Sequence, residues 1–238
     1  SLNNKIISEL ESMAKTIYDY WFLQFEFPNE EGKPYKSSGG KMVWNEELKR
    51  EIPEGWKVKN IFNVADIIYG FPLSVEKFNK NGNIPVIRIR DITSNSISAY
   101  TNELFDEKYL TKEGDLLIGM DGNFQMNFWF RDGDCVNQRI TRIREIDYPN
   151  YLIMLQIKPF IEKKVDSVAR STVWHLSDKD MKSLKILIPN NFGIYTPFRS
   201  ILNKQLLVTK ENQELTSLRD FLLPLLMNGQ VGFKEMSE

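Results

Sequence analysis

The sequence is poor in the residues that build covalent cross-links and metal sites, with one cysteine and one histidine among 238 residues. Cys135 has no partner within the chain for a disulfide, so we expect a reducing compartment, the cytoplasm. The lone histidine, His175, excludes zinc motifs built on histidine pairs. Apolar runs such as Phe221 to Met227 are far shorter than the roughly 20 residues that cross a bilayer. Because no basic, apolar signal opens the chain either, we expect no membrane partner and no export.

Charge of one sign is not in excess, because 31 basic and 32 acidic residues leave a net charge of −1. This balance excludes a uniformly basic nucleic-acid-binding protein. The arginines are unevenly placed, however: seven of the ten lie within residues 56–196, and six of those lie between Arg88 and Arg144. A site for a polyanion would therefore be a local face of the middle segment.

Familiar catalytic motifs are also missing. The sequence has no GxxxxGK[ST] phosphate loop, no GxGxxG dinucleotide fingerprint and no [DN]PP[YF] tetrapeptide of amino-group methyltransferases. We therefore expect no bound cofactor, no metal and no catalytic residue. Two weak alternatives remain. A Cys135–His175 dyad is formally conceivable, although a lone cysteine and histidine carry no spacing information. Asp19, Glu31 and Lys33 mimic a nuclease pattern, although they read more simply as solvated charges.

Both ends of the chain show helical apolar periodicity. Near the N-terminus, apolar residues recur at spacings of four and three, which is typical of a coiled-coil helix and predicts one over residues 1–24. A second series recurs every seven residues and predicts a helix over 197–230, with Thr196 as N-cap and Asn228-Gly229 at its end. Pro224 should kink or end that helix. The predicted helix interface consists of Ile6, Leu10, Met13, Ile17, Ile201, Val208, Leu215 and Leu222.

Between these helices the sequence predicts a linker and one globular domain. Residues 25–55 are rich in glycine and proline and read as a linker with a short helix at Asn45–Glu51. Residues 56–196 alternate short strands with turns, and Ile84–Ile92 reads as a strand with Arg88 and Arg90 on one face. Ser177 and Asp180 fit a capping box before a short helix. We therefore predict an α+β fold: one globular domain of short strands and helices, flanked by long coiled-coil-forming helices, with a tail at 231–238.

The polar residues of the middle segment suit the recognition of DNA bases. Arginine can take guanine O6 and N7 in a bidentate fork, and asparagine or glutamine fits adenine N6 and N7. Lys108 and Lys112 are candidate phosphate contacts. The alternative is an ordinary polar surface, and a structural Arg90–Asp91 pair competes with a reading role for Arg90. The remaining candidate DNA contacts are Arg88, Arg90, Asn123, Gln125, Asn127, Arg131, Gln138 and Arg139.

In order along the chain, a series of segments resembles the specificity subunit (HsdS) of type I restriction–modification systems. The segment from Leu10 to Asn45 is similar to the exit of a central conserved helix, and IPEGWK at Ile52–Lys57 is similar to the entry of a target-recognition domain. The other similar segments read IPVIRIRDI with EGDLLIGMDGNF, then VNQRITRI, then RSTVWHLSDKDMKSLKILIP, and last LTSLRDFLLPLLMNGQV.

This resemblance implies a subunit that reads double-stranded DNA and leaves the chemistry to its partners. Modification subunits would bring S-adenosylmethionine and methylate adenine at N6, and restriction subunits would bring ATP-driven cleavage. The family carries two target-recognition domains, whereas this sequence shows one. The chain is therefore a half-subunit or the C-terminal half of a longer one. A half-subunit is expected to form a homodimer through its helices and to favour a palindromic split site. A stand-alone dimeric DNA-binding regulator and a small nuclease remain alternatives.

Overall fold

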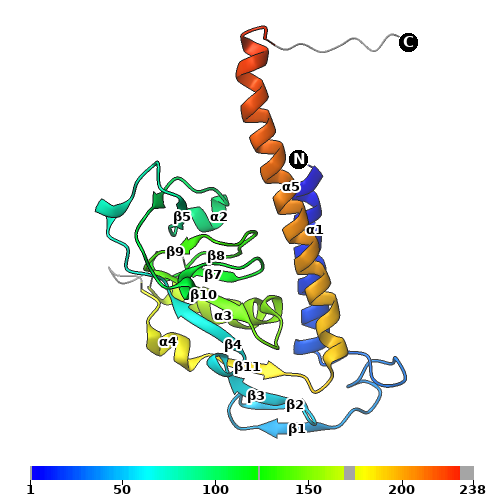
Figure 1. Ribbon diagram of the computed structural model, residues 1–238. Coiled ribbons are helices and arrows are strands. Elements are labelled where there is room, and N and C mark those ends of the chain that lie inside the picture. The colour runs from blue at the N-terminus through cyan, green and yellow to red at the C-terminus, as the bar shows by residue number, and fades with distance from the viewer. Residues whose placement is uncertain (1, 123, 169–174, 231–238) are drawn as a thin grey trace, which may run out of the picture.

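The computed structural model of the chain describes residues 2–122, 124–168 and 175–230. It consists of a body of short strands and helices that lies beside two long helices (Figure 1). The α-helices are α1 (Leu2–Tyr18), α2 (Asp91–Ser94), α3 (Asn150–Val168), α4 (Asp178–Ser183) and α5 (Thr196–Met227). Shorter turns are the π-helical η1 (Asp19–Leu23) and the 3-10 turns η2 (Ile61–Asn63), η3 (Val75–Lys77), η4 (Glu107–Tyr109) and η5 (Phe192–Tyr195).

The body is built on a four-stranded antiparallel sheet with the order β4-β10-β7-β8. A three-stranded sheet, β6-β5-β9, contains the one parallel pairing of the described strands, between β5 and β9. Two further antiparallel pairs are β1-β2 and β11-β3. The strands are β1 (Met42–Asn45), β2 (Arg50–Pro53), β3 (Lys57–Asn60), β4 (Ala65–Tyr69), β5 (Ile84–Ile87), β6 (Tyr100–Thr101), β7 (Leu116–Gly119), β8 (Met126–Phe128), β9 (Cys135–Val136), β10 (Ile140–Glu145) and β11 (Lys185–Ile188).

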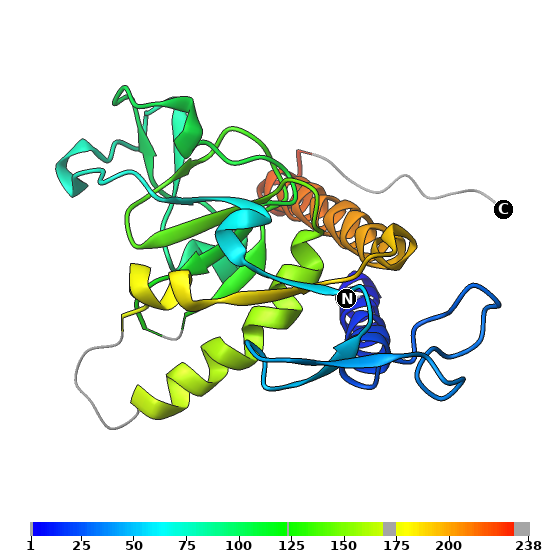
Figure 2. The same cartoon turned by 90° about the horizontal axis from the view of Figure 1, so that it is seen from below.

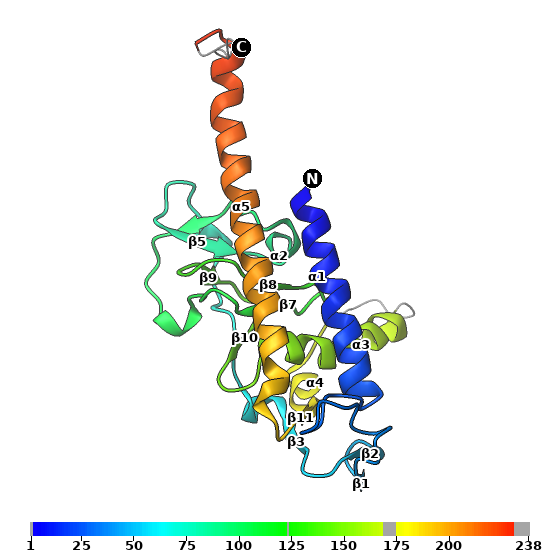
Figure 3. The ribbon, with the colours of Figure 1, turned by 90° about the vertical axis from the view of Figure 1, so that its right-hand side faces the viewer.

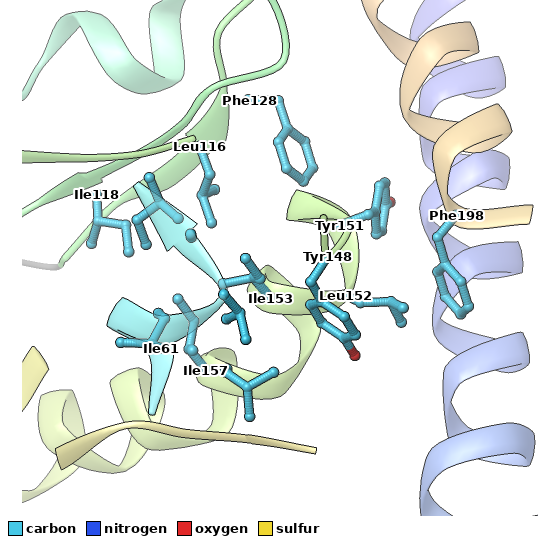
Figure 4. Packing of buried hydrophobic residues seen from close by; sticks show 14 of the residues in the cluster. Ile61, Leu116, Ile118, Phe128, Tyr148, Tyr151, Leu152, Ile153, Ile157 and Phe198 are labelled. Atoms are coloured by element: carbon cyan, nitrogen blue, oxygen red, sulfur yellow. The ribbon is translucent and has the colours of Figure 1, made fainter. Parts of the chain in front are cut away.

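The core lies between the four-stranded sheet and α3. Every residue of β7 is buried, which matches the continuous apolar run of this central strand. Figure 4 shows Ile153 and Ile157 of α3 grouped with Ile61 of η2 and with Leu116 and Ile118 of β7. Burial of these side chains fixes the sheet on α3, and so it holds the loops at the ends of β7 and β10 in place.

Helices α1 and α5 lie side by side over the length of α1 and run antiparallel (Figure 3). Seen from below, they meet at one edge of the body, away from α4 (Figure 2). Asn3 Nδ2 donates to Glu211 Oε2 over 3.0 Å near the start of α1. At the base of α5, the Phe198 ring lies 6.5 Å from the Tyr151 ring of α3. The helices therefore pack on each other and on the body at once.

Of the predicted helix interface, Met13 and Leu215 are exposed and not buried between the helices. Both side chains are 53% exposed. In α1, Ala14 is the residue with no exposure, because the covered face is shared between α5 and the body. Leu215 lies beyond Asn212, whose side chain still bonds to Asn4 at the start of α1. The other predicted interface residues are buried or half-buried, namely Ile6, Leu10, Ile17, Ile201, Val208 and Leu222.

The segment 25–55 differs from the predicted linker. The short helix predicted at Asn45–Glu51 is wrong: residues 42–53 form the β1-β2 hairpin. The Asn45 side chain accepts the backbone N–H groups of residues 47 and 48, and these bonds favour the turn over a helix. The segment also contributes to the core, because Phe25 and Phe27 are buried against Trp56 at ring-centroid distances of 5.7 and 4.9 Å.

The strand predicted at Ile84–Ile92 ends earlier, at Ile87. The Asp91 carboxylate accepts both the backbone N–H and the Nε–H of Arg88, at 2.9 and 3.1 Å. These local bonds turn the chain into α2 at residue 91, so the two arginines do not form the cationic face of a strand. Proline does not interrupt α3 either: the helix continues through Pro159, with the buried Ile157 and Ile161 on either side.

The long C-terminal helix begins one residue before its predicted start and passes through Pro224 to Met227. Asn228 caps the helix and Gly229 follows it in the left-handed conformation (φ +67°), with its N–H bonded to the Leu226 carbonyl, so the predicted Asn228-Gly229 terminus is confirmed. Within residues 2–122, 124–168 and 175–230, no helix has both the length and the apolar character that crossing a bilayer requires.

Candidate nucleic-acid interface

Three loops of the body surround a polar hollow of about 580 Å³. They are the segment after β5, the loop between β7 and β8, and the turn between β9 and β10. The lining consists of Arg88, Ile89, Arg90, Asp121, Gly122, Gln125, Asn137, Gln138 and Arg139. Three guanidinium groups and three amides therefore surround one carboxylate. Five of the ten predicted DNA contacts lie here, namely Arg88, Arg90, Gln125, Gln138 and Arg139.

A charged cluster of Asp121, Arg139 and His175 joins the hollow to the segment before α4. His175 Nδ1 lies 2.9 Å from Asp121 Oδ1, and Arg139 Nε lies 3.7 Å from Asp121 Oδ2. Since a carboxylate only accepts hydrogen bonds, Nδ1 of the histidine carries the proton in this contact. Because Nδ1 then has no free lone pair, the 3.4 Å between it and Arg139 Nη1 is a contact between two donors and not a hydrogen bond. All three side chains are more than one third exposed.

The turn that carries Arg139 is held tightly by the backbone around it. Arg139 itself has a left-handed conformation with φ +70°. Its carbonyl accepts the Met120 N–H over 2.8 Å, which ties the turn to the end of β7. On the other side, a Cβ added to Gly70 would lie 2.0 Å from the Asn137 carbonyl oxygen. Only glycine at residue 70 lets the chain approach so closely, so the position of the turn is fixed by packing.

The three arginines of the hollow differ in how free they are to contact a ligand. The Arg88 side chain is only 19% exposed, and Asp91 pairs with it and not with Arg90, which was the alternative to a reading role for Arg90. Arg88 therefore shapes the loop as well as lining the hollow. Arg90 is exposed, and the Arg139 side chain is 57% exposed. These two arginines are the available cationic donors of the hollow.

The other predicted DNA contacts are not brought into the hollow. Asn127 donates to the Ile92 carbonyl over 2.9 Å and so holds α2 against β8. Arg131 pairs with the buried Asp134. Lys108 lies over the ring of Tyr109 at 5.1 Å, and Lys112 is exposed beside the turn before β7. Asn123 lies outside the described residues.

Sequence reasoning missed the two polar residues that complete the charged cluster. Asp121 and His175 both lie in segments that carry the family resemblance, EGDLLIGMDGNF and RSTVWHLSDKDMKSLKILIP, but no pattern within either segment singles them out. The two are 54 residues apart, and only the bridge between their backbones brings them together. No local spacing signals such a pair, because the pairing of distant segments creates it.

The residues of the two weak catalytic alternatives have other contacts. Cys135 is fully buried, and burial raises the pKa of its thiol to about 12, so the nucleophilic thiolate does not form near neutral pH. Asp19 is ion-paired with Lys15 of α1, while Lys33 pairs with Glu31 in an exposed loop. In the described part of the chain, no three histidine, cysteine, aspartate or glutamate side chains gather as ligands for a metal ion.

Comparison with known proteins points to one family. A family model described as "Type I restriction modification DNA specificity domain" matches residues 53–217. The type I restriction enzyme MjaIX specificity subunit of Methanocaldococcus jannaschii is 26% identical over 95% of this chain and 54% of its own length. The EcoBI specificity subunit of Escherichia coli is 28% identical over 58% of this chain and 30% of its own length. The chain thus spans about half, or less, of these relatives.

The fold is also similar to that of a solved structure. The S subunit of a type I restriction–modification system from M. genitalium superposes with a TM-score of 0.52 at 15% sequence identity. The alignment covers 100% of this chain and 59% of that subunit. At this identity the similarity concerns the fold alone, namely a mixed body of helices and small sheets with a long C-terminal helix.

Proposed function

The chain belongs to the type I restriction modification DNA specificity domain family, and from this membership we propose that it reads DNA sequence on behalf of partner enzymes. The observation that carries the proposal is the match over residues 53–217, within which the polar hollow lies. Exposed Arg90 and Arg139, with Gln125 and Gln138, offer the donor and acceptor groups that read base edges in the major groove. Lys108 and Lys112 would contact phosphates and position the body.

The proposed partners are double-stranded DNA, a modification subunit that methylates adenine and a restriction subunit that cleaves. The chain itself would take no catalytic step and would act in the cytoplasm, where DNA is accessible to it. Recognition without chemistry fits a hollow whose described groups are donors and acceptors of hydrogen bonds. The buried thiol of Cys135 supplies no nucleophile there.

Mapping of N6-methyladenine tests this function directly. The chain would be co-expressed with a modification subunit in cells that lack adenine methylation. We expect methylation confined to one sequence motif, and its loss when the chain is omitted. An Arg90→Ala/Arg139→Ala double variant should relax or abolish the motif, whereas Lys33→Ala, in an exposed loop outside the hollow, should leave it unchanged. Methylation that does not depend on the chain would contradict the proposal, as would turnover by the purified chain alone.

We propose further that two copies associate through the projecting part of α5. Beyond Asn212, α5 has passed the start of α1 and carries large apolar side chains that are at least half exposed. These residues are Leu215, Leu218, Phe221, Leu223 and Met227. Apolar stripes on an unpaired helix are stabilised by a second helix. A twofold pair would present two identical bodies to a palindromic split site.

A further inference from the structure

Asp121 stands out among the residues of the hollow because it is the only described carboxylate that lines it. A carboxylate repels phosphate, so its presence weakens general attraction to the DNA backbone. Its neighbours nevertheless hold it in place: Oδ1 lies 2.9 Å from His175 Nδ1, and Oδ2 lies 3.7 Å from Arg139 Nε. The side chain remains 39% exposed, so it can still accept a hydrogen bond from a ligand.

We propose that Asp121 and Arg139 together read a single G·C base pair, with Arg139 on guanine and Asp121 on cytosine. This inference rests on the proposed function and assigns a specificity to the same hollow. In the major groove, guanine presents the acceptors O6 and N7, and cytosine presents the donor N4–H₂. O6 and N4 are joined across the pair, so they lie about 3 Å apart. Arg139 Nε, a donor, and Asp121 Oδ2, an acceptor, lie 3.7 Å apart, which is close to the separation of O6 and N4.

The same two side chains fit an A·T pair poorly. If Arg139 contacted thymine, O4 would accept one hydrogen bond, but the neighbouring C5-methyl group would block the second N–H group of the guanidinium. With Asp121 on adenine, N6 donates, but the adjacent N7 lone pair repels the second carboxylate oxygen. Cytosine has no acceptor beside N4 on that edge. The pair therefore selects G·C by two attractive contacts and rejects A·T by one steric and one electrostatic conflict.

His175 acts as a positioning residue for this reading pair. Its Nδ1–H donates to Asp121 and fixes the carboxylate, and the bridge between residues 121 and 175 fixes the two backbones. Arg139 Nε lies 3.7 Å from Asp121 Oδ2, which is long for a hydrogen bond, and Arg139 Nη1 lies 3.4 Å from a histidine nitrogen that already carries a proton. The N–H groups of Arg139 are therefore still available to a base.

Selection from a pool of random DNA duplexes tests the inference, because the pool contains every short target sequence. The full chain, bound to a modification subunit, would select duplexes at fixed pH and salt. We expect the wild-type consensus to contain a G·C pair at which Asp121→Asn lowers discrimination by about tenfold or more. Arg139→Lys, at a side chain that is mostly exposed, should relax the same position. Glu54→Gln, the same chemical change in an ion pair outside the hollow, should leave the consensus unchanged.

Each outcome has a separate meaning. Relaxation of one shared G·C position in Asp121→Asn and Arg139→Lys, with Glu54→Gln unchanged, supports the inference. A consensus unaltered in folded Asp121→Asn and in Arg139→Lys overturns it, while the proposed function stands. A wild-type complex that selects no sequence overturns both. Should Asp121→Asn fail to fold, Arg139→Lys decides alone, since its consensus either relaxes at a G·C pair or does not.

Discussion

Asp115 is the buried carboxylate on which the loop before β7 depends. It is 1% exposed and accepts two hydrogen bonds from Arg144, at 2.9 and 2.8 Å, and one from the Lys112 N–H at 2.7 Å. The buried Arg142 guanidinium lies 4.0 Å away. Water cannot take the place of a carboxylate so enclosed. Its removal would leave the half-buried Arg144 without a carboxylate partner, whereas Arg142 would keep its ion pair with Asp66.

We therefore predict that Asp115→Asn lowers the free energy of unfolding by about 3–5 kcal/mol. Urea denaturation followed by circular dichroism measures this change. Glu54→Gln removes one partner of an exposed pair with Lys41 and should cost less than about 1 kcal/mol. A loss below about 1 kcal/mol for Asp115→Asn would show that the arginines find other partners.

At the level of elements, α4 begins with the capping box that the sequence predicts. The Asp180 N–H donates to Ser177 Oγ over 3.2 Å, and Asp180 Oδ2 accepts the Ser177 N–H over 2.8 Å. Partial burial raises the pKa of Asp180, but hydrogen bonds from Lys164 and Ser177 outweigh it and hold the pKa below its usual value. The carboxylate is thus better stabilised in the folded chain than in the unfolded one.

Ser177→Ala should lower the free energy of unfolding by about 1 kcal/mol at neutral pH. Because the pKa of Asp180 is depressed by folding, its contribution is present above the unfolded value of about 3.9 and is lost as pH falls through the folded value. The difference between variant and wild type should therefore shrink in acid. Thermal unfolding at several pH values measures it, and a difference that grows in acid would contradict this account.

Elements whose ends depend on residues close in sequence could be predicted from the sequence. Elements whose ends depend on contacts with distant parts of the chain could not. The capping box at Ser177 and the terminus at Gly229 depend on neighbouring residues, so pattern alone located them. The strand predicted through Ile92 is wrong beyond Ile87, because the Asp91 carboxylate accepts the Arg88 N–H and turns the chain there. The alternation of apolar residues in the sequence does not indicate such a bond. The candidate site divides in the same way. Arg139 was found by residue type, whereas Asp121 and His175 meet only through tertiary pairing.

At the level of the whole molecule, α5 is longer than the helix that accompanies it. The 13 residues from Leu215 to Met227 extend about 20 Å at 1.5 Å per residue. Leu218 and Phe221 are 52% and 67% exposed there. This exposed stretch is the surface through which we expect two copies to join.

The variant Leu218→Asp/Phe221→Asp should therefore be monomeric at micromolar concentration while the wild type is dimeric. Light scattering after size exclusion measures both masses. Because the two side chains contribute little burial within one chain, the variant monomer should stay folded, and its thermal midpoint should fall only by the stability that dimerisation adds to the wild type. Leu207→Asp, at a leucine that is 59% exposed before α5 passes α1, is the matched control and should stay dimeric. A monomeric wild type would refute the association.

The left-handed backbone at Arg139 has a consequence for how this surface changes. Most residues other than glycine meet a similar steric cost at φ +70°, so the penalty belongs to the position and not to arginine. Exchange for another long, unbranched side chain leaves that cost nearly constant. Under the proposed function, the base that residue 139 contacts can therefore change by substitution while the stability of the surrounding turn stays almost the same.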